Sequence, residues 1–106
     1  MAYSDAFSEW WLVYPKKVGK RAAQKSWLVA VREIAAERGI GRAAAIAWLL
    51  GRTQMFAGSD LGENKKFRPD PERWLNRGRF DDDPDEWYTR GVPGSQNKGD
   101  VDQWRP

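Results

Sequence analysis

The feature that most constrains this chain is a set of four aromatic residues at helical spacing, followed at once by a proline. Phe7, Trp10, Trp11 and Tyr14 are separated by steps that place their side chains on one face of a helix. Pro15 comes next, and the residue before a proline is pushed out of the α region. The sequence therefore predicts a first helix that begins near residue 4, ends at residue 13 or 14, and turns its rings into the core.

Two longer helices are predicted after this break. Residues 19–38 carry apolar side chains at helical spacing, and Gly39 is the residue type that most often ends a helix in a left-handed conformation. Residues 41–56 are apolar on most sides. Because only two or three residues separate the two helices, we expect them to form an antiparallel hairpin.

Capping signals predict where a short fourth helix begins and ends. Asp70 is an N-cap candidate, Pro71 suits the first helical position, and Glu72 places a negative charge in the first turn. Gly78 is expected to end this helix. Ser4 gives a similar N-cap signal for the first helix.

These signals together predict the fold class and the domain organisation. Residues 57–66 form a loop by composition, and residues 79–80 are expected to be extended. The fold is predicted to be all-α, with a three-helix core that contains a helical hairpin, a short fourth helix and an irregular acidic C-terminal tail. The helical domain is predicted to span residues 1–80 and the tail residues 81–106.

Composition argues against several kinds of chemistry. The chain has no Cys and no His, which removes disulfides, thiolate nucleophiles, the commonest metal ligand and the usual general base. The carboxylates of residues 81–86 lack the spacing of a calcium-binding loop. No Gly-rich nucleotide-binding loop is visible. We therefore predict no catalytic residue, no metal site and no cofactor, and we do not expect an enzyme.

Hydrophobic patterning bears on location. The longest apolar run, residues 43–50, is far too short to span a bilayer, and the first residues do not resemble a signal peptide. The lack of Cys suits a reducing compartment. The sequence predicts a cytoplasmic protein of a bacterial or phage-infected cell that does not bind membranes.

Charge is unevenly distributed along the chain. The net charge is +3, yet residues 10–79 hold 15 basic and 6 acidic side chains, whereas residues 80–106 hold 3 basic and 7 acidic ones. A basic body with an acidic tail favours a nucleic-acid partner, or a tail that competes with one.

The candidate phosphate contacts are Lys16, Lys17, Lys20, Arg21, Lys25, Arg32, Arg77 and Arg79. Four of them are predicted to lie within about 80° of one another on the second helix, opposite its apolar face: Lys17, Arg21, Lys25 and Arg32. The alternative is an ordinary solvated surface, and for Arg79 an ion pair that ties the short helix to the body. A further hypothesis is that Tyr14, at the helix end beside the lysines, stacks on a base.

Two motifs together resemble a domain of phage and prophage replication proteins. They are FSEWWLVYPKKVGKRAAQKSW at residues 7–27 and PERWLNRGRFDD at residues 71–82. That domain is usually found at the C-terminal end of O-type initiators and helicase loaders. The resemblance implies a DNA-replication context, with DNA or a replicative helicase as the partner.

Three functions follow as hypotheses. The first is a non-enzymatic DNA-binding module of a phage-type replication protein, of unknown strand preference. The second is a protein-docking module for a replicative helicase or another host protein. The third is a small phage effector that inhibits a host enzyme. The docking surface would consist of Leu28, Val29, Trp87, Tyr88 and Trp104, although the three tail residues can instead pack on the helices.

Overall fold

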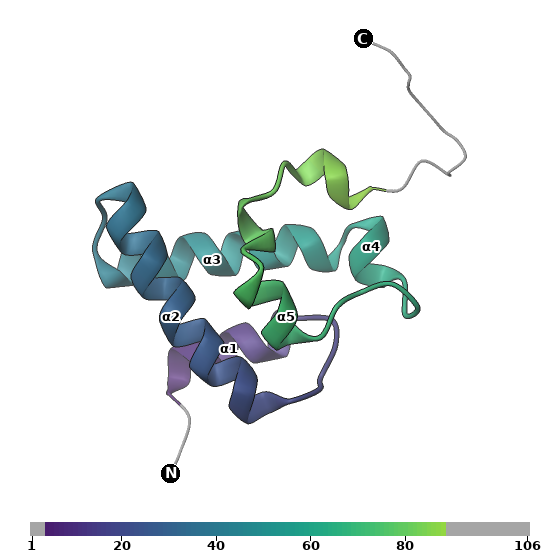
Figure 1. Cartoon of the computed structure of the whole chain (residues 1–106), viewed down its shortest axis with the longest axis horizontal. Coiled ribbons are helices and arrows are strands. Elements are labelled where there is room, and N and C mark those ends of the chain that lie inside the picture. Colours follow the sequence, from purple (N-terminus) through teal and green to yellow (C-terminus); the bar gives the residue numbers. More distant parts are fainter. Residues whose placement is uncertain (1–3, 89–106) are drawn as a thin grey trace, which may run out of the picture.

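A computed structural model describes residues 4–88 of the chain, and every regular element in that range is helical (Figure 1). The predicted all-α fold is confirmed, with its three-helix core, hairpin and short C-terminal helix. In chain order the elements are α1 (Asp5–Val13), α2 (Lys20–Arg38), α3 (Arg42–Ala57), α4 (Asp60–Glu63), α5 (Pro71–Asn76) and two 3-10 turns, η1 (Arg79–Asp81) and η2 (Pro84–Trp87).

Helix α1 begins and ends where its sequence signals predict. The side chain of Ser4 accepts a hydrogen bond from the Phe7 amide at 3.2 Å, which satisfies one of the free N–H groups of the first turn. Tyr14, the residue before Pro15, is extended with φ −63° and ψ 133°. The helix therefore ends at Val13, and the chain turns toward α2.

Two glycines in the left-handed conformation delimit α2. Gly19 has φ 69° and Gly39 has φ 64°, values that side chains with a Cβ rarely adopt. After Gly39 the chain passes through Ile40 and Gly41 and enters α3, so α2 and α3 form the predicted hairpin. Helix α5 packs against α2, and α1 packs against α3, which places the core between the two pairs (Figure 1).

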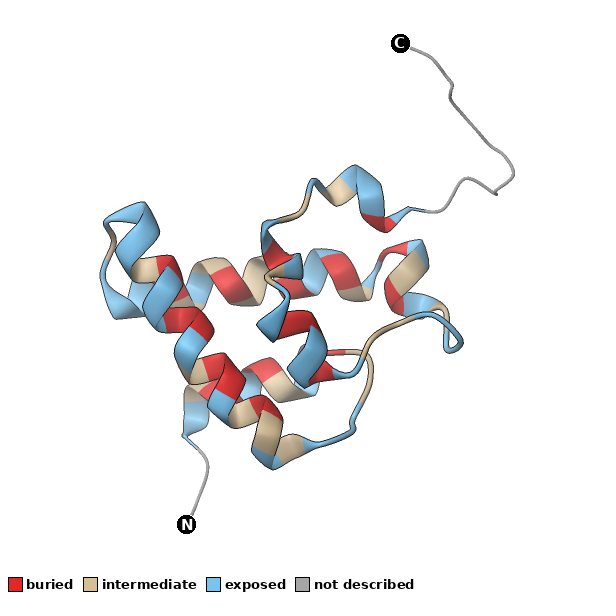
Figure 2. Ribbon diagram, viewed as in Figure 1, coloured by how far each residue is buried: buried red, intermediate tan, exposed pale blue. Residues whose placement is uncertain are grey.

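The core is dominated by a column of aromatic rings. Neighbouring rings lie with centroids 5.1 to 6.3 Å apart, a normal spacing for interacting aromatic side chains. Buried residues lie on the sides of the helices that face one another (Figure 2). In order along the column the rings belong to Phe7, Trp10, Tyr14, Phe56, Trp74 and Trp87.

Two side-chain hydrogen bonds tie α1 to distant parts of the chain. The indole N–H of Trp10 donates to the hydroxyl of Thr53 on α3 at 2.7 Å, and that hydroxyl donates in turn to the Leu49 carbonyl at 2.7 Å. The hydroxyl of Tyr14 donates to the Pro69 carbonyl at 2.7 Å. Both bonds give a buried ring a partner that it would otherwise lack.

Arg52 attaches the segment after α5 to the body. Its guanidinium donates to the Phe80 carbonyl at 2.7 Å and to the Asp82 carbonyl. The same group lies 5.4 Å from the centroid of Trp48 and 5.1 Å from that of Trp87, within the range of cation–π attraction. One side chain on α3 thus holds both the backbone and the last core ring of this segment.

Local geometry differs from the predictions in two segments. Residues 57–66 do not form an uninterrupted loop, because Ser59 accepts a hydrogen bond from the Gly62 amide at 3.2 Å and caps the single-turn helix α4. Residues 79–80 are not extended, because they belong to the 3-10 turn η1 after the left-handed Gly78.

The segment after residue 80, predicted as the start of an irregular acidic tail, contains regular structure and a core residue. The turn η2 is capped by Asp83, whose carboxylate accepts a hydrogen bond from the Asp85 amide at 3.0 Å. Trp87 is 2% exposed and packs on Phe56 and Trp74. Residues 89–106, with most of the predicted tail, lie outside the described residues.

Replacing either of two glycines with alanine should change the stability of the fold, in opposite directions. A Cβ on Gly62 would lie 1.9 Å from the Phe56 carbonyl oxygen, a backbone atom that cannot move aside, whereas a Cβ on Gly51 of α3 would meet nothing within 4 Å. We expect Gly62→Ala to lower the free energy of unfolding by about 1–3 kcal/mol or more. Gly51→Ala is expected to raise it by about 0.5–1 kcal/mol. Urea denaturation measures both, and equal effects would contradict the close approach at Gly62.

The Trp10–Thr53 bond gives a second stability prediction. Thr53→Val keeps the shape of the side chain but leaves a buried indole N–H without an acceptor, so we expect a loss of about 1–3 kcal/mol. Thr53→Ser keeps the hydroxyl and removes one methyl group, at an expected cost of about 1 kcal/mol. If serine proved as costly as valine in urea denaturation, the hydrogen bond would not be what makes Thr53 important.

Candidate nucleic-acid interface

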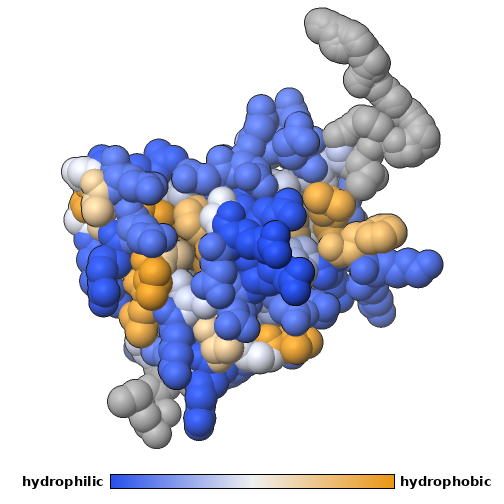
Figure 3. Space-filling model, in the orientation of Figure 1, coloured by the Kyte–Doolittle hydropathy of each residue, from blue (hydrophilic) through white to orange (hydrophobic). Residues whose placement is uncertain are grey.

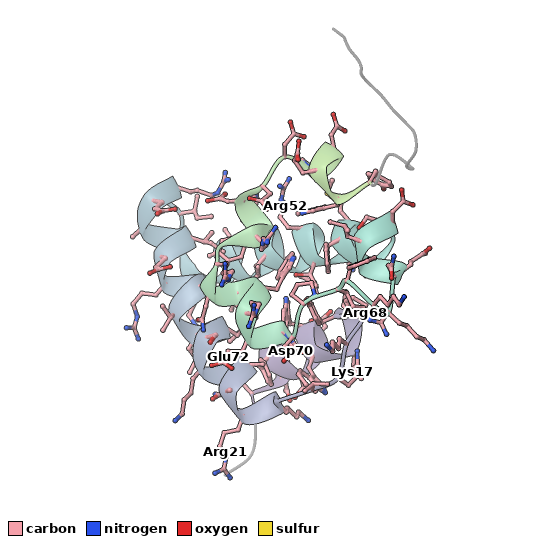
Figure 4. All side chains as sticks on the ribbon, turned by 45° about the vertical axis from the view of Figure 1, so that its right-hand side comes forward. Lys17, Arg21, Arg52, Arg68, Asp70 and Glu72 are labelled. Atoms are coloured by element: carbon pink, nitrogen blue, oxygen red, sulfur yellow. The ribbon has the colours of Figure 1, made fainter. Side chains whose placement is uncertain are left out.

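The exposed side of α2 carries three cations, which we call the basic face: Arg21, Lys25 and Arg32. Their positions in the helix place them within about 40° of one another around its axis. All three are exposed, and none has an ion pair or hydrogen bond within residues 4–88. Figure 4 shows Arg21 extending away from the body at the start of α2. Among the described residues, nothing therefore blocks these three charges from contact with a partner.

Lys17 does not belong to the basic face, so its predicted place on the second helix is wrong. It precedes Gly19, whose left-handed backbone interrupts the helical register. The ammonium group of Lys17 donates to the Leu12 carbonyl at 3.1 Å and to the Tyr14 carbonyl, so it caps the C-terminal end of α1. Partial burial lowers the pKa of Lys17, and repulsion from Arg68 lowers it further.

Lys16 and Lys20, two further predicted phosphate contacts, lie near α5 and near α1, respectively. The ammonium group of Lys16 is 2.7 Å from a carboxylate oxygen of Asp70, the N-cap residue of α5. Both side chains are partly exposed, so this pair contributes at most about 1 kcal/mol. Lys20 begins α2, with its ammonium group 5.8 Å from the centroid of Trp11. Neither residue is in line with the basic face.

Arg77 and Arg79 lie at the end of α5 and in η1. Arg79 pairs with Asp82 at 3.7 Å, a local contact three residues along the chain that does not join the short helix to the body. Arg77 is exposed and borders a shallow hollow of about 280 Å³ that is also lined by Asp70, Glu72, Arg73 and Asn76. The mixed charges of this hollow make it a weaker anion site than the basic face.

A larger pocket of about 530 Å³ opens between the end of α3, α4, the loop before α5 and the two 3-10 turns. Figure 3 shows strongly hydrophilic atoms over α5 and hydrophobic atoms beside them toward α4. The pocket combines cations with aromatic rings and has one acidic side chain, Asp70. Its cations and aromatic rings include Lys16, Phe67, Arg73, Trp74, Arg79 and Trp87.

Sequence reasoning missed two members of this pocket, Phe67 and Arg73. Phe67 is 68% exposed although it is a large aromatic residue. The segment NKKFR at residues 64–68 places this aromatic residue between cations, a pattern that could have indicated a binding residue. Its composition was interpreted only as that of a loop. Arg73 lies in α5 and gave no separate signal. The pocket forms from segments far apart in the chain, which no single motif reveals.

Tyr14 is not available to stack on a base. Its ring is 0% exposed and lies in the aromatic column, with the hydroxyl bound to Pro69. Burial raises the pKa of Tyr14 above its usual value, and the nearby Asp70 carboxylate raises it further, while Arg68 and Arg79 oppose the change. Figure 4 shows Asp70, Lys17 and Arg68 on the same side of the molecule. Tyr14 therefore positions the loop that borders the pocket.

The residues predicted to dock a protein do not form one patch. Leu28 packs partly against the core, and the neighbouring Val29 is 48% exposed beside Lys25 and Arg32. Of the alternatives for the tail, Trp87 packs on the helices, while Tyr88 is 45% exposed. Trp104 lies outside the described residues.

Other kinds of site find no support within residues 4–88. No group of three or more acidic side chains is arranged so that it could hold a metal ion. No described helix combines the length and apolar character that crossing a membrane requires.

Comparison with protein families gives a match over most of the chain. The profile of the Legionella vir region protein LvrA C-terminal domain matches residues 2–78, from before α1 to the end of α5. The chain belongs to this family. The LvrA C-terminal domain match spans the basic face, α4 and all the pocket residues except Arg79 and Trp87, and it ends before η1. It does not bear on the resemblance to phage replication proteins, which stays a prediction.

Comparisons with curated proteins and with solved structures gave no match.

Tyr14→Phe tests the role of the buried hydroxyl through pH. At neutral pH the variant leaves the Pro69 carbonyl without its donor, and we expect a loss of about 1–3 kcal/mol in the free energy of unfolding. Above about pH 10 an unfolded tyrosine loses its proton while folded Tyr14 keeps it. The folded state then binds more protons, so the wild-type protein loses stability as the pH rises.

The variant lacks that alkaline loss, so its stability curve should approach the wild-type curve above about pH 10. Urea denaturation over a pH series measures the difference. Tyr88→Phe, at a 45% exposed position, is the matched control and should follow the wild-type curve. Parallel curves for wild type and Tyr14→Phe would mean that Tyr14 ionises equally in both states.

Proposed function

We propose that this chain is a non-enzymatic DNA-binding module that contacts phosphates through the basic face of α2. The observation that supports it is the set of exposed cations at Arg21, Lys25 and Arg32, which have no acidic partner within residues 4–88. Phosphate contacts of this kind supply most of the sequence-independent affinity of DNA-binding proteins.

The dimensions of the basic face fit a phosphate backbone. Arg21 and Arg32 are 11 positions apart on a regular helix, so their Cα atoms are separated by about 16 Å along its axis. At about 3.4 Å per nucleotide along one strand, that length corresponds to about five nucleotides. The three cations can thus reach several phosphates of one strand at once.

The composition of the chain supports a binding role over catalysis. The whole sequence lacks the Cys and His residues that most often act as nucleophile and general base. We further propose that the module serves in a phage-type replication protein. This finer assignment rests only on the motifs at residues 7–27 and 71–82 and on their resemblance to that class of protein.

A protein-docking module is the second candidate, because apolar side chains remain exposed on α1 and α2. Leu12 is 75% exposed at the end of α1, and Val29 is 48% exposed on α2. A replicative helicase is the partner that the replication resemblance favours. Pull-down from host lysate after nuclease treatment separates the two candidates, since recovery of a helicase then requires a direct protein contact.

The salt dependence of DNA binding tests the first candidate. If the three cations each contact a phosphate, the slope of log K against log salt should be about −2.7 on duplex DNA and about −2.1 on a single strand. Replacing Arg21 and Lys25 with Gln should reduce the duplex slope to about −0.9 and weaken binding. Gel-shift titrations at several salt concentrations provide both values.

A control with the same change in net charge is available on α3. Ala43→Glu with Ala44→Glu places two new carboxylates at exposed positions in the first turn of that helix, where negative charge is tolerated. This control should retain most of the wild-type slope. A wild-type slope near zero, or equal binding by the two double variants, would contradict the proposed function.

A further inference from the structure

The pocket beside α5 has an excess of positive charge and shares no residue with the basic face. Lys16, Arg73 and Arg79 line it, against the single carboxylate of Asp70. Lys16 is already paired with Asp70, and Arg79 with Asp82. Arg73 has no ion pair within the described part of the chain. The pocket therefore suits an anion, and Arg73 is the cation most available to bind it.

An exposed ring stands at the edge of the same pocket. Phe67 is 68% exposed, and the turn that carries it is fixed by Asn64, whose side chain accepts a hydrogen bond from the Lys66 amide at 2.9 Å. The Asn64 carbonyl also accepts from the Phe67 amide at 3.1 Å and from the Arg68 amide at 3.0 Å. These hydrogen bonds hold the backbone of the turn, which places the flat apolar ring of Phe67 next to the cations.

Two tryptophans of the pocket wall have unused hydrogen-bond donors. The indole nitrogens of Trp74 and Trp87 are buried and have no acceptor within residues 4–88, whereas the indole of Trp10 has Thr53. Buried donors are almost always paired in folded proteins, so two such groups at one cavity are unusual. Both side chains line the pocket, so a ligand bound there is a candidate source of the acceptor.

We infer that this pocket binds one nucleotide, with its phosphate on Arg73 and its base against Phe67. A phosphate with up to two negative charges matches the cation excess better than a single carboxylate does. A base offers both a flat ring for stacking and ring acceptors for the indole N–H groups. The volume of about 530 Å³ is within the range of small-molecule sites.

The nucleotide can come from two sources, a free mononucleotide or an unpaired residue of a single strand. The inference goes beyond the proposed function, because phosphate contacts through the basic face of α2 do not require the pocket. If both hold, the pocket gives the module a preference for unpaired ends or gaps in DNA. The basic face alone can contact phosphates of single or double strands, so the pocket would be the part of the molecule that distinguishes them.

Calorimetric titration of the full chain tests the inference with thymidine monophosphate, inorganic phosphate and a short oligo(dT). The two pocket variants are Arg73→Gln and Phe67→Ala, both at exposed positions. We expect the mononucleotide and the oligonucleotide to bind more tightly than inorganic phosphate. Phe67→Ala should weaken nucleotide binding about 5- to 150-fold, the range for loss of one stacking ring, and Arg73→Gln should weaken phosphate and nucleotide together.

The variant Arg21→Gln with Lys25→Gln is the matched control, and it should bind the mononucleotide as the wild type does. Trp87→Phe keeps the ring and removes one indole N–H, so it should weaken nucleotide binding without affecting phosphate. Thermal unfolding verifies that every variant is folded.

Three results would overturn the inference: mononucleotide binding with the same affinity as phosphate, no binding of either the mononucleotide or the oligonucleotide, or oligonucleotide binding that is insensitive to both pocket variants. Binding of the oligonucleotide alone, lost on pocket substitution, would support the single-strand source. Loss of duplex binding only in the α2 variant would still support the proposed function, so the two ideas fail separately.

Discussion

The contact on which the rest of the structure depends is the aromatic column that runs from Phe7 on α1 to Trp87 in η2. Helices α1, α3 and α5 each contribute at least one ring, and the turn η2 contributes the last. Each large aromatic residue removes about 150–250 Å² from water, so a few rings supply much of the core of a chain of 106 residues. Trp27 of α2 packs against Phe7 at the start of the column, with ring centroids 5.7 Å apart. The basic face of α2 and the walls of the pocket are therefore held in place by elements that contribute to the column or pack against it.

The polar atoms of the column divide the molecule into a satisfied end and an unsatisfied end. At the α1 end, Trp10 donates to Thr53 and Tyr14 donates to Pro69. At the other end, the indole nitrogens of Trp74 and Trp87 have no acceptor within residues 4–88. The satisfied end acts as the structural anchor. The unsatisfied end coincides with the pocket that we propose binds a nucleotide.

Regular periodicity and glycine or proline signals were sufficient to predict α1, α2, α3 and α5, because these signals act within a few residues. The single turn α4 was missed, since it depends on Ser59 capping a glycine-rich stretch rather than on periodicity. The candidate site was only partly predictable. Arg21, Lys25 and Arg32 share a face as the helical spacing indicated, but one left-handed residue, Gly19, removed Lys17 from that register. The pocket was beyond prediction, because its walls come from segments that only the tertiary fold brings together.

The long sequence separations of the α1 contacts also bear on how the chain acquires its structure as it leaves the ribosome. The hydrogen-bond acceptor of Tyr14 lies 55 residues later in the chain, and that of Trp10 lies 43 residues later. A helix of nine residues is marginal in isolation, so we expect α1 to dock only after the local hairpin of α2 and α3 has formed. Until Pro69 has emerged, Tyr14 lacks its hydrogen-bond acceptor, and we expect its ring to stay exposed in the nascent chain, where chaperones can bind it.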